Sequence, residues 1–383
     1  MAMAPHLSPA NPDRSEGRHA GPADIGHWDY DIAIVGTVGL PPNYGGFETL
    51  AGRLVEHWGG RRRVIVYCSA PDLPATTAPQ ARYLDADLAY VNLRANGWQS
   101  IPYDAVCLFR AARHAQAILL LGVSGAIVLP LLRLLHPSVR IVTNIDGLEW
   151  RRAKWGWFSR RFLKFSERIA VRASHMVVAD NRAIADHIAA AYGASSACIP
   201  YGGDFDPEDT SRAVAPSPYF LMLCRIEPEN NVEAILTAFA ASPRMRLVAV
   251  GNWQHSPYAR QLRERFGTVP NCELRDPVYD RTVVARLRRE ATAYVHGHSA
   301  GGTNPALVEA MALGCAVLAY DVSYNRHTTD NQASYWRDDA DLRSLLATQD
   351  AGALAANGNR MAYIARERYR WPDIALAYES LLT

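Results

Sequence analysis

Residues 294–314 (YVHGHSAGGTNPALVEAMALG) hold several residue types that bind anions and hydroxyl groups. The run 293–296 is short and apolar, which predicts a buried strand. Gly301 and Gly302 follow this strand, and glycine adopts backbone conformations that a Cβ would forbid. A glycine pair at the end of a strand allows the backbone to approach a ligand closely.

A helix start follows the two glycines. Thr303 or Asn304 can cap this helix, and Pro305 suits its first position. The free N–H groups and the positive dipole end of such a helix attract phosphate. Glu309 lies in the second turn, where its carboxylate can accept hydrogen bonds from hydroxyl groups beside that phosphate. A nucleotide sugar carries both groups, so the segment predicts a site for this class of ligand.

Residues 36–48 (GTVGLPPNYGGFE) form another glycine-rich loop, directly after a predicted strand at 31–35. The loop lacks the GxGxxG spacing, and the next predicted strand ends without an acidic residue, which disfavours a dinucleotide site. Gly45 and Gly46 nevertheless lie at the carboxyl end of a strand, where α/β sheets bind ligands. Two interpretations remain open: the glycine pair faces a ligand, or the loop packs tightly without one.

Arg225 ends a further buried strand, in the sequence LMLCRIEPENN. An arginine at this place can bind two phosphate oxygens at once through its forked guanidinium group. A structural ion pair with Glu227 or Glu229 fits the spacing equally well. Asn230 or the asparagine after it would begin the following helix, and we include Glu229 and Asn230 with Arg225 among the candidate ligand-binding residues.

Asp146 is the candidate carboxylate of the first half of the chain. The sequence Asn144-Ile-Asp-Gly follows a predicted strand at 140–143, so Asp146 would face a cleft at the carboxyl end of the sheet. There it can orient an acceptor hydroxyl group or accept its proton. It can equally cap a helix that starts near Leu148. The sequence does not choose between these two roles.

Length and composition restrict the class of protein. At 383 residues the chain exceeds the usual size of one hydrophobic core, so we expect two domains. Its 40 basic and 38 acidic residues leave a formal charge of +2, which gives no electrostatic argument for a nucleic-acid partner. The six cysteines show no CxxC pair and no metal-ligand spacing, which predicts buried thiols in a reducing cytoplasm and no bound metal.

Two stretches could be mistaken for targeting or membrane segments. Residues 1–28 are rich in Pro, Ala, Gly and His and lack the apolar core of a signal peptide, so we expect a disordered tail. Residues 115–132 carry no charged side chain, and this run is about as long as a short membrane helix. The turn sequence Gly122-Val-Ser-Gly125 divides this run, and Pro130 lies in its second part. We therefore expect a strand, a turn and a helix of the protein core.

Residues 150–172 (WRRAKWGWFSRRFLKFSERIAVR) form a basic segment within a nearly neutral chain. At helical spacing one face carries four apolar side chains, and the basic side chains lie elsewhere. The apolar face favours packing into the domain core. A basic helix with aromatic anchors can also dock on an anionic bilayer, so contact with phospholipid or with a lipid-linked diphosphate remains open. The apolar face consists of Phe158, Phe162, Phe165 and Ile169, and the basic cluster of Arg160, Arg161, Lys164 and Arg168.

Short apolar runs alternate with longer amphipathic ones along the chain, which is typical of parallel βαβ units. A stretch rich in proline and acidic residues separates two such series, so we expect an acceptor domain at 29–205, a linker at 206–218 and a second domain at 219–368. The predicted strands lie at 31–35, 64–68, 118–121, 140–143, 175–179 and 197–199 in the first series and at 219–224, 246–250, 272–274, 293–296 and 316–319 in the second.

The motifs together resemble the retaining GT-B glycosyltransferases of family 4, and most closely the bacterial rhamnosyltransferases that make cell-surface polysaccharide. The resemblance implies two Rossmann-like, doubly wound parallel-sheet domains that face each other across a cleft, with a last helix at 369–383 crossing back to the first domain. It runs from about residue 31 to the end of the chain and rests on six segments in the family's order: VGTVGLPPNYGGFETLAGRLV, TNIDGLEWRRAKW, IPYGGD, CRIEPENN, HGHSAGGTNPALVEAMALG and YRWPDIALAYESLL.

The resemblance also assigns roles to single residues. Glu309 matches the second Glu of the family's Glu-x7-Glu motif, which holds the nucleotide ribose, and Arg225 matches the arginine that neutralises the donor diphosphate. Gly45 and Gly46 match the glycine loop beside the acceptor and the donor phosphates. With Asp146, the residues Arg225 and Glu309 are our candidate catalytic residues.

The chain departs from the wider family at three places. Gly301 stands where the first motif Glu is expected, Asn230 replaces a lysine, and the usual histidine is not evident near Asp146. The missing Glu ordinarily contacts the sugar of donors such as glucose or mannose, so its loss favours a different sugar, as in dTDP-rhamnose. Phosphate charge is then left to Arg225, to the amides of residues 302–304, and to His298 if that residue is not a structural histidine.

We therefore expect an enzyme that moves L-rhamnose from dTDP-rhamnose to a lipid-linked saccharide acceptor, with retention and without a metal cofactor. We expect it in the cytoplasm, where residues 150–172 would touch the inner face of the plasma membrane. Two other classes remain open: a UDP-hexose transferase or nucleotide-sugar epimerase of the same fold, and a sugar-nucleotide-binding protein without catalytic activity.

Overall fold

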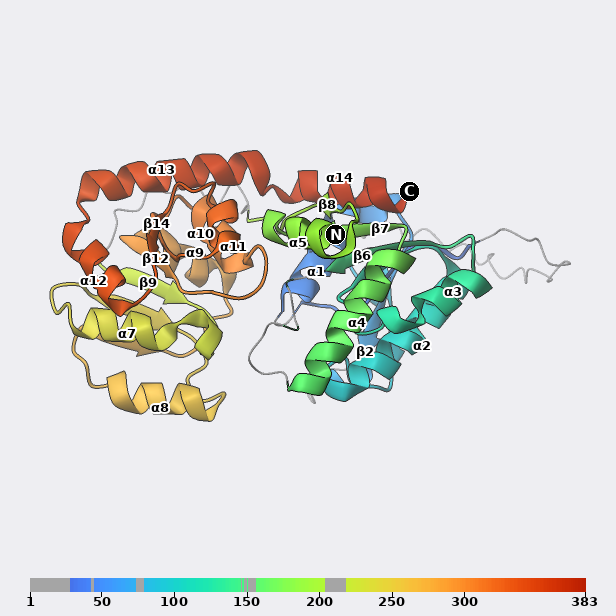
Figure 1. Ribbon diagram of the computed structural model, residues 1–383, viewed down its shortest axis with the longest axis horizontal. Coiled ribbons are helices and arrows are strands. Elements are labelled where there is room, and N and C mark those ends of the chain that lie inside the picture. The colour runs from blue at the N-terminus through green and yellow to red at the C-terminus, as the bar shows by residue number, and fades with distance from the viewer. Residues whose placement is uncertain are drawn as a thin grey trace, which may run out of the picture.

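The computed structural model describes residues 28–42, 45–73, 79–145, 147, 150, 156–203 and 218–383. The predicted tail, nearly all of the predicted linker and Asp146 lie outside these residues. The described part of the chain folds around two sheets, and helices cover both faces of each sheet (Figure 1).

The first sheet has eight strands in the order β3-β4-β2-β1-β5-β6-β7-β8. All neighbouring strands are parallel except β3 and β4. Its central strands are buried on both faces, which explains why they read as continuous apolar runs in the sequence. The strands are β1 (Tyr30–Val35), β2 (Val64–Ser69), β3 (Arg82–Tyr83), β4 (Ala86–Val91), β5 (Ala115–Leu121), β6 (Arg140–Ile145), β7 (Met176–Ala179) and β8 (Ala197–Cys198).

Helices of the first domain pack on both faces of this sheet. One face carries the side chains of α2, α3, α4 and α5, and the other carries α1 and the last helix of the chain. The helices are α1 (Gly46–Trp58), α2 (Ser100–His114), α3 (Leu129–Leu135), α4 (Trp157–Ala173) and α5 (Arg182–Tyr192), with short 3₁₀ helices η1 (Gly59–Arg61), η2 (Ala70–Asp72), η3 (Gly97–Gln99) and η4 (Ala126–Val128).

The second sheet has six parallel strands in the order β11-β10-β9-β12-β13-β14. Side chains of α7, α8 and α12 pack on one face, and those of α9, α10 and α13 on the other. The strands are β9 (Phe220–Leu223), β10 (Leu247–Val250), β11 (Cys272–Arg275), β12 (Ala293–His296), β13 (Val317–Tyr320) and β14 (Ser334–Trp336). The helices are η6 (Pro228–Asn230), α7 (Val232–Ala240), α8 (Pro257–Phe266), α9 (Arg281–Glu290), α10 (Pro305–Ala312), α11 (Ser323–Thr328), α12 (Asp339–Thr348), α13 (Ala351–Arg368) and α14 (Trp371–Leu382).

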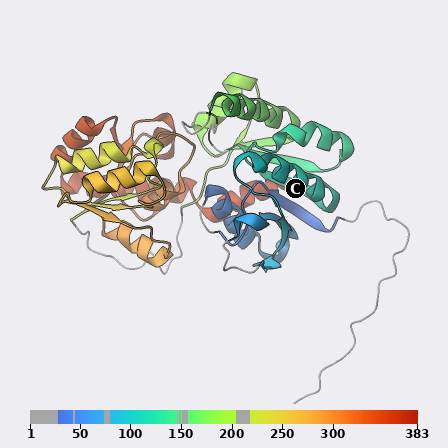
Figure 2. The same ribbon diagram turned by 90° about the horizontal axis from the view of Figure 1, so that it is seen from below.

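The last two helices run along both domains, α13 over the second and α14 over the first (Figure 1). In Figure 2 the two domains stand side by side. Trp58 Nε1 donates a hydrogen bond to the carbonyl of Ala375 at 3.0 Å, and Asn144 Nδ2 donates to Tyr378 Oη at 2.6 Å. Helix α14 therefore completes the core of the first domain.

The structure corrects part of the prediction for residues 150–172. Phe162 and Ile169 pack against the core of the first domain, whereas Phe158 is 81% exposed and Phe165 53% exposed. The buried face of α4 is centred instead on small and polar positions around Ala170. The predicted apolar face lies at the margin of the contact with the core, because the helix is rotated relative to that stripe.

Residues 115–132 form β5, η4 and the start of α3, in agreement with the expected strand, turn and helix. Among the helices that the structure describes, none is long and apolar enough to cross a bilayer. Three strands were not predicted: β3, β4 and β14. Strand β4 alternates buried and partly exposed residues, and β3 and β14 have only two and three residues, so none gives a continuous apolar run.

Candidate active site

The predicted ligand-binding residues of the second domain gather at the carboxyl ends of two neighbouring strands. Arg225 follows β9, and residues 297–304 follow β12, which pairs directly with β9. Because the strands are parallel, both loops leave the sheet at the same edge. The carboxyl edge of the second sheet thus carries the two loops that the sequence singled out.

Side chains join these two loops. Asn230 Nδ2 donates a hydrogen bond to the carbonyl of Arg225 at 2.7 Å, and Asn230 Oδ1 lies 2.7 Å from His298 Nδ1. The backbone N–H and the hydroxyl of Ser299 both donate to the carbonyl of Glu229, at 2.9 and 2.8 Å. Asn230 is buried, as is His298. At the position of the expected lysine the chain therefore has an amide that ties the two loops together.

The guanidinium group of Arg225 is only loosely paired. Its Nη1 lies 3.7 Å from Glu227 Oε1, and the arginine side chain is 41% exposed. An exposed ion pair at this distance contributes little to stability and is easily exchanged for another anion. The pairing that the sequence allowed is present, and it leaves the guanidinium accessible to a ligand.

Gly301 has no room for a side chain. Its φ of +135° is rarely adopted by other residues, and a Cβ built on it would lie 2.8 Å from His298 Nε2. Gly147 of the first domain approaches from the other side, since a Cβ on Gly147 would lie 2.9 Å from the Cα of Gly301. His298 therefore occupies the space that a Cβ at position 301 would need, and the first domain packs against the Cα of Gly301.

Thr303 makes contacts to the first domain that the sequence did not indicate. Its backbone N–H donates to Asp180 Oδ2 at 3.2 Å, and its hydroxyl donates to the carbonyl of Asp180 at 2.5 Å. A Cβ on Gly302 would lie 1.9 Å from Asp180 Oδ1, so glycine is needed there for the carboxylate to fit. In this arrangement a carboxylate from the first domain lies against the backbone that we expected to bind phosphate.

Asn181 extends this contact between the domains. Its Nδ2 has three acceptors in the second domain: Thr303 Oγ1 at 3.3 Å, the carbonyl of Tyr324 at 3.2 Å and Thr328 Oγ1 at 3.2 Å. Its Oδ1 accepts from the backbone N–H of Ala183 and caps α5. One buried side chain thus fixes both a helix start and the position of the opposite domain.

Helix α10 begins as the sequence predicts. Asn304 is its N-cap and accepts a hydrogen bond from the N–H of Ala306 at 2.9 Å, and Pro305 is the first helical residue. Glu309 lies one turn further on. Its Oε2 is 2.6 Å from Nη1 of Arg288 on α9, a side chain that is 1% exposed, while the side chain of Glu309 is 31% exposed. One oxygen of the carboxylate is therefore held by a buried arginine, while the Glu309 side chain stays partly exposed to solvent.

The two glycines of the first domain pack closely. A Cβ on Gly45 would lie 1.8 Å from Glu48 Oε2, and a Cβ on Gly46 would lie 3.1 Å from the hydroxyl of Tyr201. The carboxylate of Glu48 folds back toward the start of its own helix and accepts the N–H of Val38 at 2.8 Å. Tight packing thus accounts for both glycines without a ligand, and the ligand-facing interpretation stays a prediction.

The loop after β8 connects this region to Glu309. Tyr201 lies against Gly46, and two residues later a Cβ on Gly203 would lie 2.4 Å from the carbonyl of Val308. The N–H of Gly203 donates to the carbonyl of Tyr369 at 2.9 Å. Residues 201–203 therefore lie between the glycine loop of the first domain and α10 of the second.

His296 shows that the end of β12 is strongly desolvated. Burial lowers the pKa of His296 to about 3, against a smaller opposite effect of its hydrogen bond with Asn325. Its ring centroid lies 6.0 Å from that of His298. The imidazole of His296 is therefore neutral near pH 7 and adds no charge to the site.

Three residues of the site were missed in the sequence: Asp180, Asn181 and Arg288. Asp180 and Asn181 directly follow a predicted strand, and this position was a usable signal. Arg288 lies in the sequence RLRRE, which has the charge pattern of a solvated helix face. The local sequence gives no sign that Arg288 is buried; the fold shows it.

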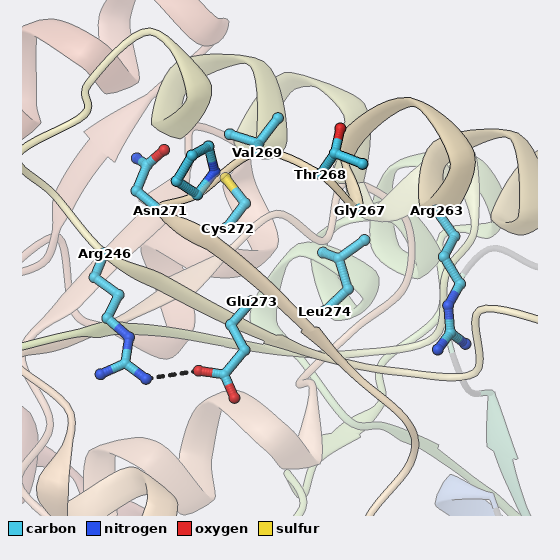
Figure 3. A pocket seen from close by; sticks show the side chains of 10 residues that line it. Arg246, Arg263, Gly267, Thr268, Val269, Asn271, Cys272, Glu273 and Leu274 are labelled. Atoms are coloured by element: carbon cyan, nitrogen blue, oxygen red, sulfur yellow. Dashed lines mark hydrogen bonds and ion pairs between the residues drawn. The ribbon is translucent and has the colours of Figure 1, made fainter.

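Two hollows of the surface lie elsewhere. One, of about 500 Å³, surrounds the start of β10 and β11 and contains the ion pair of Arg246 with Glu273 (Figure 3). The other, of about 600 Å³, surrounds Tyr30 and Val64 at the start of β1 and β2. Both lie at the amino ends of their strands, opposite to the edge with the candidate residues.

Comparison with known families divides the chain in two. Residues 30–204 match a domain of unknown function, DUF1972, and residues 208–346 match the family described as glycosyl transferases group 1. A comparison with curated proteins gave no match.

Solved structures with a similar fold cover nearly the whole chain. A sucrose-phosphate synthase from Thermosynechococcus elongatus has 16% identity and a TM-score of 0.73, over 92% of this chain and 98% of the other. A glycosyltransferase from Rickettsia africae has 12% identity and a TM-score of 0.64, over 92% and 98%. An E. coli trehalose-6-phosphate structure with bound UDP-2-fluoro glucose has 10% identity and a TM-score of 0.66, over 92% and 98%.

These likenesses agree with the two facing parallel sheets and establish the GT-B fold. The match to the glycosyl transferases group 1 family covers the segment that holds Arg225, His298 and Glu309. The protein is a glycosyltransferase with the GT-B fold, and its residues 208–346 match the glycosyl transferases group 1 family.

Proposed function

We propose that the protein transfers L-rhamnose from dTDP-rhamnose to a saccharide acceptor with retention of the anomeric configuration. In this proposal the donor lies at the carboxyl edge of the second sheet, with its diphosphate near Arg225 and its pentose at Glu309. The acceptor approaches from the first domain. The resulting product belongs to a cell-surface polysaccharide of a bacterium.

The observation that carries the choice of sugar is the crowded position 301. His298 Nε2 occupies the space that a side chain on Gly301 would take, and the φ of +135° disfavours any residue but glycine. No carboxylate can therefore reach the sugar from position 301. A 6-deoxy sugar lacks one of the hydroxyl groups of a common hexose and needs fewer polar partners, which supports rhamnose.

Catalysis in this proposal depends on stabilising the leaving diphosphate. The bond between the anomeric carbon and the diphosphate oxygen breaks, a bond from the same carbon to the acceptor oxygen forms, and the acceptor proton passes to the departing diphosphate. Arg225 can stabilise the negative charge that develops on the diphosphate, because its side chain is 41% exposed and only loosely paired. This scheme needs no protein base, and Asp146 can serve by orienting the acceptor.

A UDP-hexose donor is the second candidate. One structure of similar fold contains UDP-2-fluoro glucose, and its likeness to this chain extends over 92% of the residues. The two candidates differ in both the pentose and the sugar, so a donor panel separates them.

Thermal unfolding of the purified protein with dTDP-rhamnose, UDP-glucose and GDP-mannose tests the proposal. Because a ligand that binds only the folded state raises the midpoint, dTDP-rhamnose should give the largest increase. A larger increase with UDP-glucose would instead support the second candidate. NMR of the anomeric centre of a transfer product then tests retention.

We further propose that the acceptor is lipid-linked and that α3 and α4 rest on an anionic bilayer. These helices contact each other, and both expose apolar side chains to solvent. The exposed surface of α4 carries basic side chains beside aromatic ones. Binding to an anionic bilayer uses both, since basic groups attract the headgroups and apolar groups enter the membrane. The exposed apolar residues are Leu131, Leu134 and Leu135 of α3 with Trp157, Phe158 and Phe165 of α4; the exposed basic ones of α4 are Arg160, Arg161, Lys164, Arg168 and Arg172.

Sedimentation with liposomes checks the bilayer contact. The protein should sediment with vesicles of anionic phosphatidylglycerol and much less with phosphatidylcholine. Replacement of Arg160, Lys164 and Arg168 by Glu should abolish sedimentation, whereas Glu at the exposed Arg281 and Arg286 of α9 should not. Unchanged sedimentation of the α4 variant would contradict the proposal.

A further inference from the structure

Arg288 is buried without the hydrogen bonds that a buried arginine normally makes. Its side chain is 1% exposed, yet within the part of the chain that the structure describes neither Nε nor Nη1 makes a hydrogen bond of good geometry. Its close side-chain contact is the ion pair of Nη1 with Glu309 Oε2 at 2.6 Å. Arginine keeps its proton in proteins, so this pair places a positive charge directly beside the carboxyl group of Glu309.

Stability alone gives little reason for this pair. The cost of desolvating an arginine and a carboxylate often exceeds their attraction, and apolar replacements of similar size are frequently as stable. A buried charge with incomplete hydrogen bonding therefore suggests a role in the site. The direct effect of Arg288 is on the carboxylate, since it fixes the position of one of the two oxygens of Glu309.

The other oxygen of Glu309 is left for a ligand. Oε1 has no hydrogen bond to any described residue, and the side chain is 31% exposed although its partner is buried. A carboxylate with two free oxygens can accept the 2′ and 3′ hydroxyl groups of a ribose side by side. Because Arg288 is buried, its ion pair holds Oε2 toward the interior, and Oε1 is the oxygen we take to meet the ligand.

We propose that Arg288 sets the pentose preference of the donor site by occupying Oε2 of Glu309, so that the site accepts a 2′-deoxyribose nucleoside diphosphate without penalty. This inference rests on the proposed function, in which Glu309 binds the pentose of the donor. Arg288 acts through Glu309 and is a positioning residue. In this arrangement Oε1 accepts the 3′ hydroxyl, which a deoxyribonucleotide also carries, and Oε2 is turned away from the 2′ hydroxyl of a ribonucleotide.

Calorimetric titration with UDP and with dUDP isolates this effect, because the two ligands differ only in the 2′ hydroxyl group. The wild-type protein should bind both with dissociation constants within about twofold of each other. In Arg288→Met the freed Oε2 can accept the 2′ hydroxyl, so UDP should bind about tenfold more tightly than dUDP, the usual effect of a hydrogen bond to a charged group.

Two variants control the experiment. Arg288→Lys keeps a cation beside Oε2 and should keep the wild-type ratio. If Arg288→Met does not fold, Arg288→Leu, which also removes the cation, takes its place and should show the same preference for UDP. Arg286→Met changes an exposed arginine of the same helix and should leave the ratio unchanged.

The outcomes separate this inference from the proposed function. If the wild-type protein binds neither nucleotide, or if Glu309→Gln leaves the affinity for both unchanged, the site assignment itself fails. If Glu309 is required but wild-type protein already prefers UDP about tenfold, the role of Arg288 is refuted. A ratio that is the same in Arg288→Met and in the wild-type protein refutes it as well.

Discussion

At the scale of single residues, several ionisable side chains of this protein lie in buried surroundings. Glu309 is paired with a buried arginine, and His296 is held neutral by its surroundings. Asp104 on α2 is a third case, at 4% exposure. A Cβ on Gly125 would lie 2.3 Å from the Cβ of Asp104, so the carboxyl group lies in a closely packed place.

Asp104 predicts a dependence of stability on pH. Burial raises the pKa of Asp104 from 3.8 to about 8, against a smaller lowering by its hydrogen bond with the backbone of Gly125. Between these values the folded state binds more protons than the unfolded state, so the free energy of unfolding falls as pH rises from about 4 to about 8. One such group contributes a slope of at most about 1.4 kcal/mol per pH unit.

Chemical denaturation at pH 5 and pH 8 measures this slope. Asp104→Asn cannot titrate, so it should lose less stability than the wild-type protein over the same interval. Asp85→Asn, in the exposed turn between β3 and β4, serves as the control and should keep the wild-type slope. An Asp104→Asn slope equal to that of the wild-type protein would show that Asp104 does not titrate in this range.

At the scale of elements, α14 joins the end of the chain to the first domain. Tyr378 is fully buried, and its hydroxyl accepts a hydrogen bond from Asn144 Nδ2 at 2.6 Å. Arg62 Nε donates to Glu379 Oε1 at 2.7 Å at the rim of the same contact. The core of the first domain is thus incomplete without the last twelve-residue helix.

Replacement of Tyr378 by Ala should lower the free energy of unfolding by about 3–5 kcal/mol, because it leaves a cavity in the core and an unpaired amide on Asn144. Tyr363 of α13 is 62% exposed, so Tyr363→Ala should change stability by less than about 0.5 kcal/mol. Urea unfolding compares the two variants. Similar losses in both would contradict the role assigned to α14.

The elements that the sequence predicted well are those with continuous apolar runs. The strands at the centre of both sheets were found within one to three residues, because parallel strands covered by helices on both faces are apolar throughout. Strand β4 was not predicted because buried and partly exposed residues alternate along it. The rotation of α4 was missed because four apolar residues at helical spacing do not reveal which of them a neighbouring sheet will cover.

The candidate site was predictable in part for a related reason. Gly301, Asn304 and Glu309 were marked by the local rules for turns and helix starts. The pairing of Arg288 with Glu309 and that of Asp180 with Thr303 join segments far apart in the chain. Nothing in the local sequence distinguishes these buried charged residues from ordinary surface ones.

At the scale of the whole molecule, one cluster of hydrogen bonds connects the two domains beside the candidate donor site. Asn181 reaches three acceptors in the second domain, and the carboxylate of Asp180 accepts the N–H of Thr303. A donor phosphate at Thr303 would have to take the place of this carboxylate. We therefore expect the arrangement of the domains and the binding of a donor phosphate to be coupled through these residues.

Asn181→Ser should loosen the arrangement of the domains. Serine can still cap α5, but it has no amide group to reach the three acceptors in the second domain. Small-angle X-ray scattering should show a larger radius of gyration for this variant than for the wild-type protein. Asp280→Ser exchanges the N-cap of α9, away from this contact, and should leave the radius unchanged. An unchanged radius for Asn181→Ser would contradict the coupling.

The central claim is that the donor binds at Glu309, and calorimetric titration with dTDP-rhamnose tests it without knowledge of the acceptor. The wild-type protein should bind this donor, and Glu309→Gln should weaken binding at least about tenfold through loss of a charged hydrogen-bond acceptor. Glu264→Gln, on the exposed face of α8, should bind like the wild type. Equal affinity of Glu309→Gln and the wild-type protein would contradict it.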